Sequence, residues 1–172
     1  NLGVLLGNGN GTFAAVKTIT ATAMNGPFDN SIVDVNKDGK MDILATSFNI
    51  GLTHVFLGDG AGNFAAQANV TVGTNSHFIT TGDVNQDGKL DFVSNDWTGG
   101  AINVRLGNGT GGFSAAQTLA TGTQAAASRL VDVNNDNILD LVNVTNGTSK
   151  GYVFLGNGTG TFANPSTFNT QN

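Results

Sequence analysis

Three Asp-rich segments of nine residues carry the side chains best suited to chemistry in this sequence. They share the frame D-x-N-x-D-x-x-x-D and start at Asp34, Asp83 and Asp132. Ca²⁺ takes about six to eight oxygen ligands from carboxylates, amides, backbone carbonyls and water. Side chains at positions 1, 3, 5 and 9, with the backbone carbonyl of position 7, would wrap one ion. The spacing predicts three calcium sites: Asp34, Asn36, Asp38, Lys40 and Asp42; Asp83, Asn85, Asp87, Lys89 and Asp91; and Asp132, Asn134, Asp136, Ile138 and Asp140.

The distribution of acidic residues supports this interpretation. All 12 are Asp, and nine of them lie in the three segments. Without metal these carboxylates would repel one another, whereas three Ca²⁺ would change the formal charge from -5 to about +1. The alternative is three Asp/Asn turns without an ion. An EF-hand is excluded because its frame needs Glu at position 12, where this sequence has Ala45, Ser94 and Asn143.

Position 6 of each segment needs a residue that tolerates a left-handed backbone. Gly39 and Gly88 occupy it in the first two segments, and Asn137 occupies it in the third. Asn is the non-Gly residue that best accepts a positive φ. We therefore expect a positive φ at all three positions, with some strain at Asn137.

A second marker recurs in phase with the Asp segments. The Gly-rich stretch Leu6–Phe13 returns at Leu57–Phe64, Leu106–Phe113 and Leu155–Phe162. Runs of β-branched and aromatic residues between the markers predict four antiparallel strands per repeat. One such sheet cannot bury both faces alone, so we expect an all-β fold, a β-propeller of about three and a half blades, with a β-sandwich as the alternative. The expected units are a half blade at 1–24 and blades at 25–73, 74–122 and 123–172.

At these residues the chain resembles the FG-GAP/VCBS repeat family. The Asp segments match its D-x-[DN]-x-D-G-x-x-D signature, and LGNGTGTF matches its Gly-rich tag. The resemblance implies a β-propeller with one Ca²⁺, mainly structural, in the loop between the first two strands of each blade. Integrin α-subunit heads, lectins and surface proteins of unknown role belong to this family. The chain departs from the signature at Asn137.

The unit at 1–24 contains only the third and fourth strands of a repeat. Two copies of the chain would total the strands of a seven-bladed ring. Both spare halves would be the same hairpin, however, so neither could supply the missing first and second strands. We therefore expect part of a larger propeller, completed by the remainder of the propeller or by self-association, rather than a half-ring dimer.

Aromatic residues outside the Asp segments are candidates for ligand binding. Aligned by repeat, Phe48 and Trp97 share one position with Asn146, and His77 shares another with Phe28. Rings on a propeller rim can stack on sugars or anchor peptides. Trp97, Phe48 and His77 could thus bind a carbohydrate or a protein partner; packing of Trp97 between blades is the alternative.

Composition excludes several classes of function. The chain has no Cys for disulfides or thiolate metal sites, no run of 18 apolar residues for a membrane helix and no basic cluster for nucleic acid. No nucleophile motif is present. We do not expect an enzyme, and a glycan-acting enzyme is the remote alternative.

We therefore expect a secreted or cell-surface module for adhesion or ligand recognition in which Ca²⁺ is structural. The alternative is a purely structural surface, matrix or filament repeat, which the low charge and the 25 Gly residues suit. Six N-x-S/T sequons could carry glycans in a secreted eukaryotic protein. They are Asn10, Asn69, Asn108, Asn143, Asn146 and Asn157.

Overall fold

The computed structural model describes residues 1–122 and 124–170, so the expected unit 123–172 begins and ends outside the described residues. This part of the chain is all-β, apart from one 3₁₀ turn, η1 (Phe48–Ile50). The strands are β1 Leu2–Val4, β2 Lys17–Ile19, β3 Pro27–Val33, β4 Asp42–Ser47, β5 Leu52–Gly58, β6 Phe64–Ala66, β7 Val70–Thr71, β8 Ser76–Gly82, β9 Asp91–Asp96, β10 Ala101–Gly107, β11 Phe113–Ala120, β12 Ala125–Val131, β13 Asp140–Thr145, β14 Lys150–Phe154 and β15 Ser166–Asn169.

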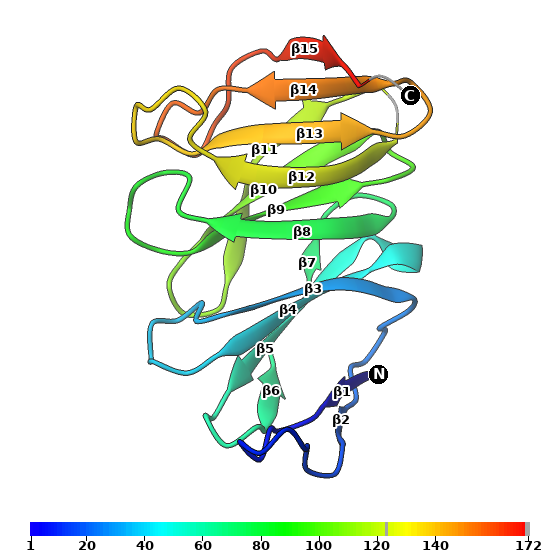
Figure 1. Cartoon of the computed structure of the whole chain (residues 1–172), viewed down its shortest axis with the longest axis vertical. Helices are drawn as coiled ribbons and strands as arrows, with labels where there is room; N and C mark the ends of the chain where they lie inside the picture. The colour runs from blue at the N-terminus through cyan, green and yellow to red at the C-terminus, as the bar shows by residue number, and fades with distance from the viewer. Residues whose placement is uncertain (123, 171–172) are drawn as a thin grey trace.

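The strands form four antiparallel sheets, in each of which chain neighbours pair (Figure 1). The pair β1–β2 is called here the half-blade. Blade 1 is β3–β4–β5–β6, with β7 also paired to β5; blade 2 is β8–β9–β10–β11; blade 3 is β12–β13–β14–β15. The sheets follow one another along the long axis of the molecule, with the half-blade and blade 3 at opposite ends (Figure 1). These four-stranded meanders are the blade-like units that the repeats predicted.

The second strand of each blade is the most buried element. Every residue of β4 and of β9 is buried. Such a strand has a partner on each edge and a neighbouring sheet on each face, so its sequence does not alternate between apolar and polar residues. The Asp loops open directly into these strands and are thereby fixed to the most rigid part of each blade.

Three apolar clusters fill the seams between consecutive sheets. In each seam, the side of a blade that faces the C-terminal end of the stack packs against the N-facing side of the next blade. The half-blade seam contains Leu2, Val4 and Ile19 against Ile43, Ala45 and Phe56. The blade 1–2 seam contains Val35, Leu44, Val55 and Val72 against Ile79 and Phe92. The blade 2–3 seam contains Val84, Val93, Val104 and Leu119 against Leu141, Phe154 and Phe162.

The fourth strand of blade 1 is interrupted. Both β6 and β7 pair with β5, and residues 67–69 separate them. One residue more lies on this side than on β5, which makes a bulge. The same irregularity occurs in blade 2 opposite Val104 and Arg105, where β11 nevertheless remains continuous.

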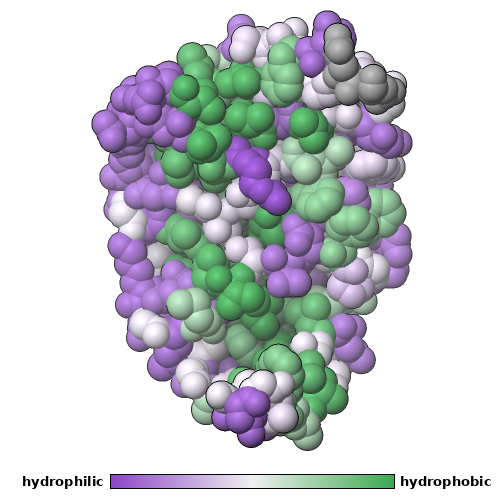
Figure 2. Space-filling view, viewed as in Figure 1, coloured by the Kyte–Doolittle hydropathy of each residue, from purple (hydrophilic) through white to green (hydrophobic). Residues whose placement is uncertain are grey.

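The connections divide between two rims, because successive turns of a meander lie at opposite ends of its strands. The three Asp loops and the Gly-rich turns form one rim, called the Asp rim, and η1 and the turn after β9 lie on the other (Figure 1). Apolar surface also reaches the solvent toward both ends of the stack (Figure 2).

Candidate metal loops and aromatic rim

The first Asp loop is organised by its own backbone amides. Asp34 Oδ1 and Asn36 Oδ1 both accept a hydrogen bond from the Asp38 amide, at 3.2 and 3.0 Å. Asp34 Oδ2 accepts from the Gly39 amide at 2.8 Å, and Asp38 Oδ1 accepts from the Lys40 amide at 2.9 Å. Oxygens from positions 1 and 3 are thus held close together at the loop surface, as the frame requires.

The second loop repeats this geometry. Asp83 Oδ1 and Asn85 Oδ1 accept from the Asp87 amide at 3.2 and 3.1 Å, and Asp83 Oδ2 accepts from the Gly88 amide at 2.7 Å. The φ values of Gly39 and Gly88 are 81° and 79°. The predicted positive φ at position 6 is therefore confirmed in both loops.

Asn137 preserves the same turn in the third loop. Its φ is 65°, as predicted, and its amide donates to Asp132 Oδ2 at 2.8 Å. Asp132 Oδ1 accepts from the amides of Asn134, Asn135 and Asp136 at 3.2, 2.7 and 3.3 Å. These backbone donors outweigh the opposing effect of burial and lower the pKa of Asp132.

Lysines balance the charge of the first two loops only. Lys40 Nζ lies 3.3 Å from Asp38 Oδ2, and Lys89 Nζ lies 2.9 Å from Asp87 Oδ2. The backbone amide of Lys40 is the main cause of a lowered pKa at Asp38, whereas the Lys89 ammonium is the main cause at Asp87. The third loop has Ile138 at this position and therefore lacks an internal cation.

The Asp at position 9 has a structural task that the sequence did not indicate. Asp42, Asp91 and Asp140 are fully buried. Each places one carboxylate oxygen 2.9 Å from the amide of the position 2 Val and the other 2.8 Å from the amide of a Gly in the Gly-rich turn. Burial raises the pKa of Asp91, and these donors oppose the shift. These carboxylates tie the start of the second strand to the end of the third.

The donor chemistry of the loops fits a hard cation. Each loop presents carboxylate, amide and backbone oxygens, which are the ligands that Ca²⁺ prefers, and no thiolate or imidazole. Because the position 9 carboxylate is fully buried, positions 1 and 5 supply the accessible carboxylates. Within residues 1–122 and 124–170, no three acidic or His side chains gather as a preformed metal cluster. An ion would therefore draw the position 5 side chain inward, from its lysine partner in the first two loops and from the Asn134 amide in the third.

The three predicted ligand-binding side chains lie together on the rim opposite the Asp loops, called here the aromatic rim. The His77 ring centroid is 5.5 Å from that of Phe48 and 4.7 Å from that of Trp97. Phe28 joins them at 3.7 Å from His77, and Phe78 adds an edge contact at 4.7 Å. His77 is buried, which lowers its pKa. The cluster spans blades 1 and 2 and combines residues from β3, η1, β8 and the turn after β9.

Asp96 fixes the turn that carries Trp97, a role that the sequence did not predict. Its carboxylate accepts hydrogen bonds from the amides of Thr74, Asn75 and Gly99 at 2.9, 3.0 and 3.0 Å, and from the Thr74 hydroxyl at 2.9 Å. Asn75 continues the network, because its carbonyl accepts from the Trp97 amide at 3.0 Å. The only sequence signal was that Asp96 is one of three Asp residues outside the loops.

Blade 3 does not repeat the aromatic cluster. Asn146 takes the position of Trp97, and its side chain donates to Gln124 at 3.0 Å.

The six N-x-S/T sequons differ in how accessible their Asn side chains are. Asn143 is completely buried and donates to the Ala127 carbonyl, whereas the other five Asn residues are exposed. The prediction that Asn143 could carry a glycan is therefore wrong for the folded chain.

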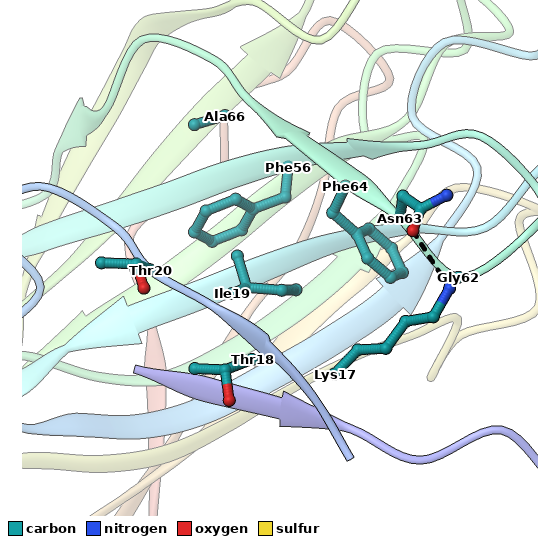
Figure 3. Close-up of a pocket in the computed structure, with 9 residues that line it drawn as sticks. All are labelled: Lys17, Thr18, Ile19, Thr20, Phe56, Gly62, Asn63, Phe64 and Ala66. Atoms are coloured by element: carbon teal, nitrogen blue, oxygen red, sulfur yellow. Dashed lines mark hydrogen bonds between the residues drawn. The ribbon is translucent and has the colours of Figure 1, made fainter. Parts of the chain in front are cut away.

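A groove of about 250 Å³ opens between β2 and blade 1 (Figure 3). Phe56 and Phe64 line it on the blade side, and Lys17 spans one end by bonding to the turn after β5 at 2.9 and 3.0 Å. In the next seam, Arg105 occupies the position of Phe56 and donates to the Thr71 carbonyl. The half-blade seam is thus less filled than its neighbour, and its groove lies away from the aromatic rim.

The FG-GAP-like repeat family matches residues 1–45, 34–94 and 83–143, and the chain belongs to this family. No curated protein matches the chain. Among solved structures, the chain is similar to an Agrocybe aegerita lectin described as recognising non-reducing terminal N-acetylglucosamine, with 21% identity and a TM-score of 0.65. The match covers 98% of this chain and 46% of the lectin, so the chain spans less than half of that protein. At this identity the likeness shows the fold, and the predicted propeller architecture is confirmed.

A second similar structure is a Photorhabdus luminescens Tc holotoxin pore, at 19% identity and a TM-score of 0.38 over 92% of this chain and 10% of the other. A likeness this low carries no argument. No helix in the described part of the chain is long and apolar enough to cross a membrane.

Proposed function

We propose that this chain is a calcium-stabilised propeller module that binds carbohydrate on its aromatic rim, outside the cell and without catalysis. One observation carries the proposal. Phe28, Phe48, His77 and Trp97 converge from two blades, although up to 69 residues separate them in the sequence. The C–H faces of a sugar stack well on such rings. The similarity of the fold to an N-acetylglucosamine-binding lectin supports this class of ligand.

Polar groups around the rings complement the hydroxyls of a sugar. The side chains of Asn49 and Thr98 are exposed on the same rim. The Asn75 side chain donates to the Phe48 carbonyl at 2.6 Å, so the blade 1 ring and the Trp97 turn belong to one hydrogen-bonded unit. A rim that is already ordered loses little conformational entropy when a ligand binds.

Calcium would act on the opposite rim as part of the scaffold. Asp34, Asp83 and Asp132, with the Asn and Asp residues at positions 3 and 5, would hold one ion per loop through oxygen ligands. The ion supplies positive charge to loops rich in carboxylate. Because each loop leads into a completely or largely buried second strand, ordering the loop stabilises the blade that carries the ligand site.

Glycan-array binding of the purified chain tests the recognition site. We expect binding to glycans with terminal N-acetylglucosamine or a related sugar, and at least a tenfold loss in Trp97→Ala, since an aromatic anchor contributes more than about 1.4 kcal/mol. Phe168→Ala removes an exposed ring at the far end of the stack and is the matched control. Equal binding by both variants, or no binding to any glycan, would contradict the proposal.

A purely structural role is the second candidate function. It is favoured by the apolar side chains exposed at both ends of the stack. Adhesion and assembly are compatible in one protein, because the end faces and the aromatic rim occupy different surfaces.

A further inference from the structure

Gln86 connects the second Asp loop to the third, which lies beside it on the Asp rim (Figure 1). It occupies position 4 of the second loop, between the predicted ligands Asn85 and Asp87. Its side-chain Nε2 donates a hydrogen bond to the carbonyl of Asn137 in the third loop, at 3.1 Å. The two residues are 51 positions apart in the sequence, so the contact exists only because blade 3 packs on blade 2.

The peptide group between Asn137 and Ile138 is held at both of its polar atoms. Gln86 donates to its carbonyl oxygen, and its N–H donates to Asp136 Oδ1 at 2.8 Å. Ile138 is the residue whose own carbonyl is the predicted backbone ligand of the third site. The contact with Gln86 thus orients the backbone immediately before that ligand.

The side chain of Gln86 also packs where the third loop meets the Gly-rich turn of blade 3. Its Oε1 and Cδ atoms lie 3.3 and 3.7 Å from where a Cβ on Gly158 would stand. Ile138 Cδ1 lies 3.5 Å from the same point. Gln86 therefore lies against the same turn that the position 7 side chain of the third loop covers.

Position 4 of every Asp loop has a positive φ, a feature that the sequence did not predict. The φ values are 60° at Lys37, 57° at Gln86 and 62° at Asn135. Asn accepts this conformation readily, whereas Gln and Lys are strained in it. The left-handed backbone at Gln86 aims the side chain at the third loop, and ligation through the two neighbouring residues would hold the same backbone in place. Each of these two interactions therefore supports the other.

The first and second loops have only a partial version of this contact. Lys37 occupies position 4 of the first loop, and its Nζ lies 3.6 Å from where a Cβ on Gly88 would stand. Its ammonium carries positive charge toward the second loop, whereas Gln86 is neutral. In the described part of the chain, Gln86 gives the second and third loops a hydrogen-bonded link that the first and second loops lack.

We propose that Gln86 is a positioning residue for the third calcium site and couples that site to the second. When the second loop is loaded, Gln86 keeps its left-handed backbone and its bond to Asn137, and so orders the third loop for loading. By thermodynamic linkage, loading of the third loop strengthens the second site by the same factor. This inference rests on the proposed calcium sites and adds that two of the three ions bind cooperatively.

Calcium titrations followed by proton–nitrogen NMR test the proposal. The amides of Gly88 and Asn137 report separately on the second and third loops, because each donates to the position 1 carboxylate of its own loop. Asp83→Asn should empty the second loop and weaken the third about fivefold, an effect expected of one hydrogen bond. Asp132→Asn should weaken the second loop by the same factor.

Gln86→Met keeps the length of the side chain and removes its donor. In this background, Asp83→Asn should change the affinity of the third loop by no more than about twofold. Gln117→Ala is the matched control, since Gln117 also bridges blades 2 and 3 but bonds to the backbone of Phe162, at 3.1 and 2.7 Å, rather than to an Asp loop. It should lower the melting temperature and leave the coupling intact.

The outcomes separate this inference from the calcium sites themselves. Three ions that bind with the same site affinities in wild type and in Gln86→Met, each with and without Asp83→Asn, would overturn the coupling and leave the sites standing. A chain that binds no calcium in any loop would overturn both. Loss of coupling in Gln117→Ala as well would show that the general packing of blade 3 on blade 2, rather than Gln86, carries it.

Discussion

The second and third Asp loops share a backbone frame but balance their charge in different ways. Both hold the position 1 carboxylate against the amides of positions 5 and 6. The second loop has Gly88 and Lys89, and the third has Asn137 and Ile138. The turn survives the loss of Gly because Asn accepts a φ of 65°.

The packing of the position 7 side chain on the Gly-rich turn explains why Ile can replace Lys there. The stem of Lys89 lies beside Gly109, with a Cδ atom 3.1 Å from where a Cβ would stand. Ile138 covers the equivalent Gly158 at 3.5 Å. An apolar stem on the Gly-rich turn is therefore the common requirement, and the ammonium is an addition that the third loop lacks. We therefore expect the third loop to depend more on an external cation.

The largest expected effect on stability concerns the buried Asp at position 9, which the second and third loops share. Asp91→Ala and Asp140→Ala should each lower the free energy of unfolding by about 2–5 kcal/mol, because each leaves two backbone amides without an acceptor. Urea denaturation measures both changes. With all three variants measured in EGTA, Asp87→Ala, an exposed side chain of the same type, is the control and should cost far less. If the free energy of unfolding fell by only a small amount in one of the two variants, the two-amide contact of the position 9 carboxylate would not stabilise both loops alike.

Removal of calcium is expected to have the next largest effect. EGTA should lower the melting temperature and excess Ca²⁺ should restore it, with a stabilisation of about 2.7 kcal/mol per site at a hundredfold excess over Kd. Asp83→Asn and Asp132→Asn should each remove one ion from the stoichiometry measured by calorimetry. Unchanged melting, together with no metal by elemental analysis, would refute the three sites.

Exchanging position 7 between the loops sharpens the comparison. Ile138→Lys should weaken calcium binding at the third loop and raise the melting temperature of the calcium-free protein slightly, because the new ammonium balances Asp136. Lys89→Ile should do the reverse at the second loop. Titration calorimetry and thermal melts of the two variants give the comparison. Changes of the same sign in both variants would show that packing, not charge, governs this position.

The smallest expected effect concerns pH and salt. Both Asp87 and Asp132 have a pKa below the usual 3.8, so their stabilisation is present above that value and is lost as pH falls through the lowered pKa. High salt should raise the pKa of Asp87 toward 3.8, because the Lys89 ammonium is the main cause of its lowered value. The pKa of Asp132 should change less with salt, because backbone amides are what lower it. Carboxyl NMR titrations of the calcium-free protein measure both values. Equal salt shifts would contradict this assignment of causes.

The sequence predicted much of the Asp loops because their geometry is local. Asp34, Asn36 and Asp38 contact amides at most five residues away, so spacing alone placed them on one turn. The task of Asp42 could not be predicted, because one of its two donors, the Gly58 amide, lies 16 residues ahead across two strands. Aligning the repeats predicted Phe48, Trp97 and His77 as candidate binding residues. It predicted neither how many rings gather on the aromatic rim nor which of them are in contact.

By itself, the sequence determined the repeat length, the phase of the Asp loops and an all-β fold of four-stranded units. These properties follow from residue types at fixed short spacings. The tertiary structure alone decided that His77 and Phe28 come within 3.7 Å and that Asp96 holds the Trp97 turn. The first contact joins residues 49 positions apart and is fixed only when blade 2 packs on blade 1. The second brings the amides of Thr74 and Asn75 to a carboxylate 22 and 21 residues away, which happens only when β8 pairs with β9.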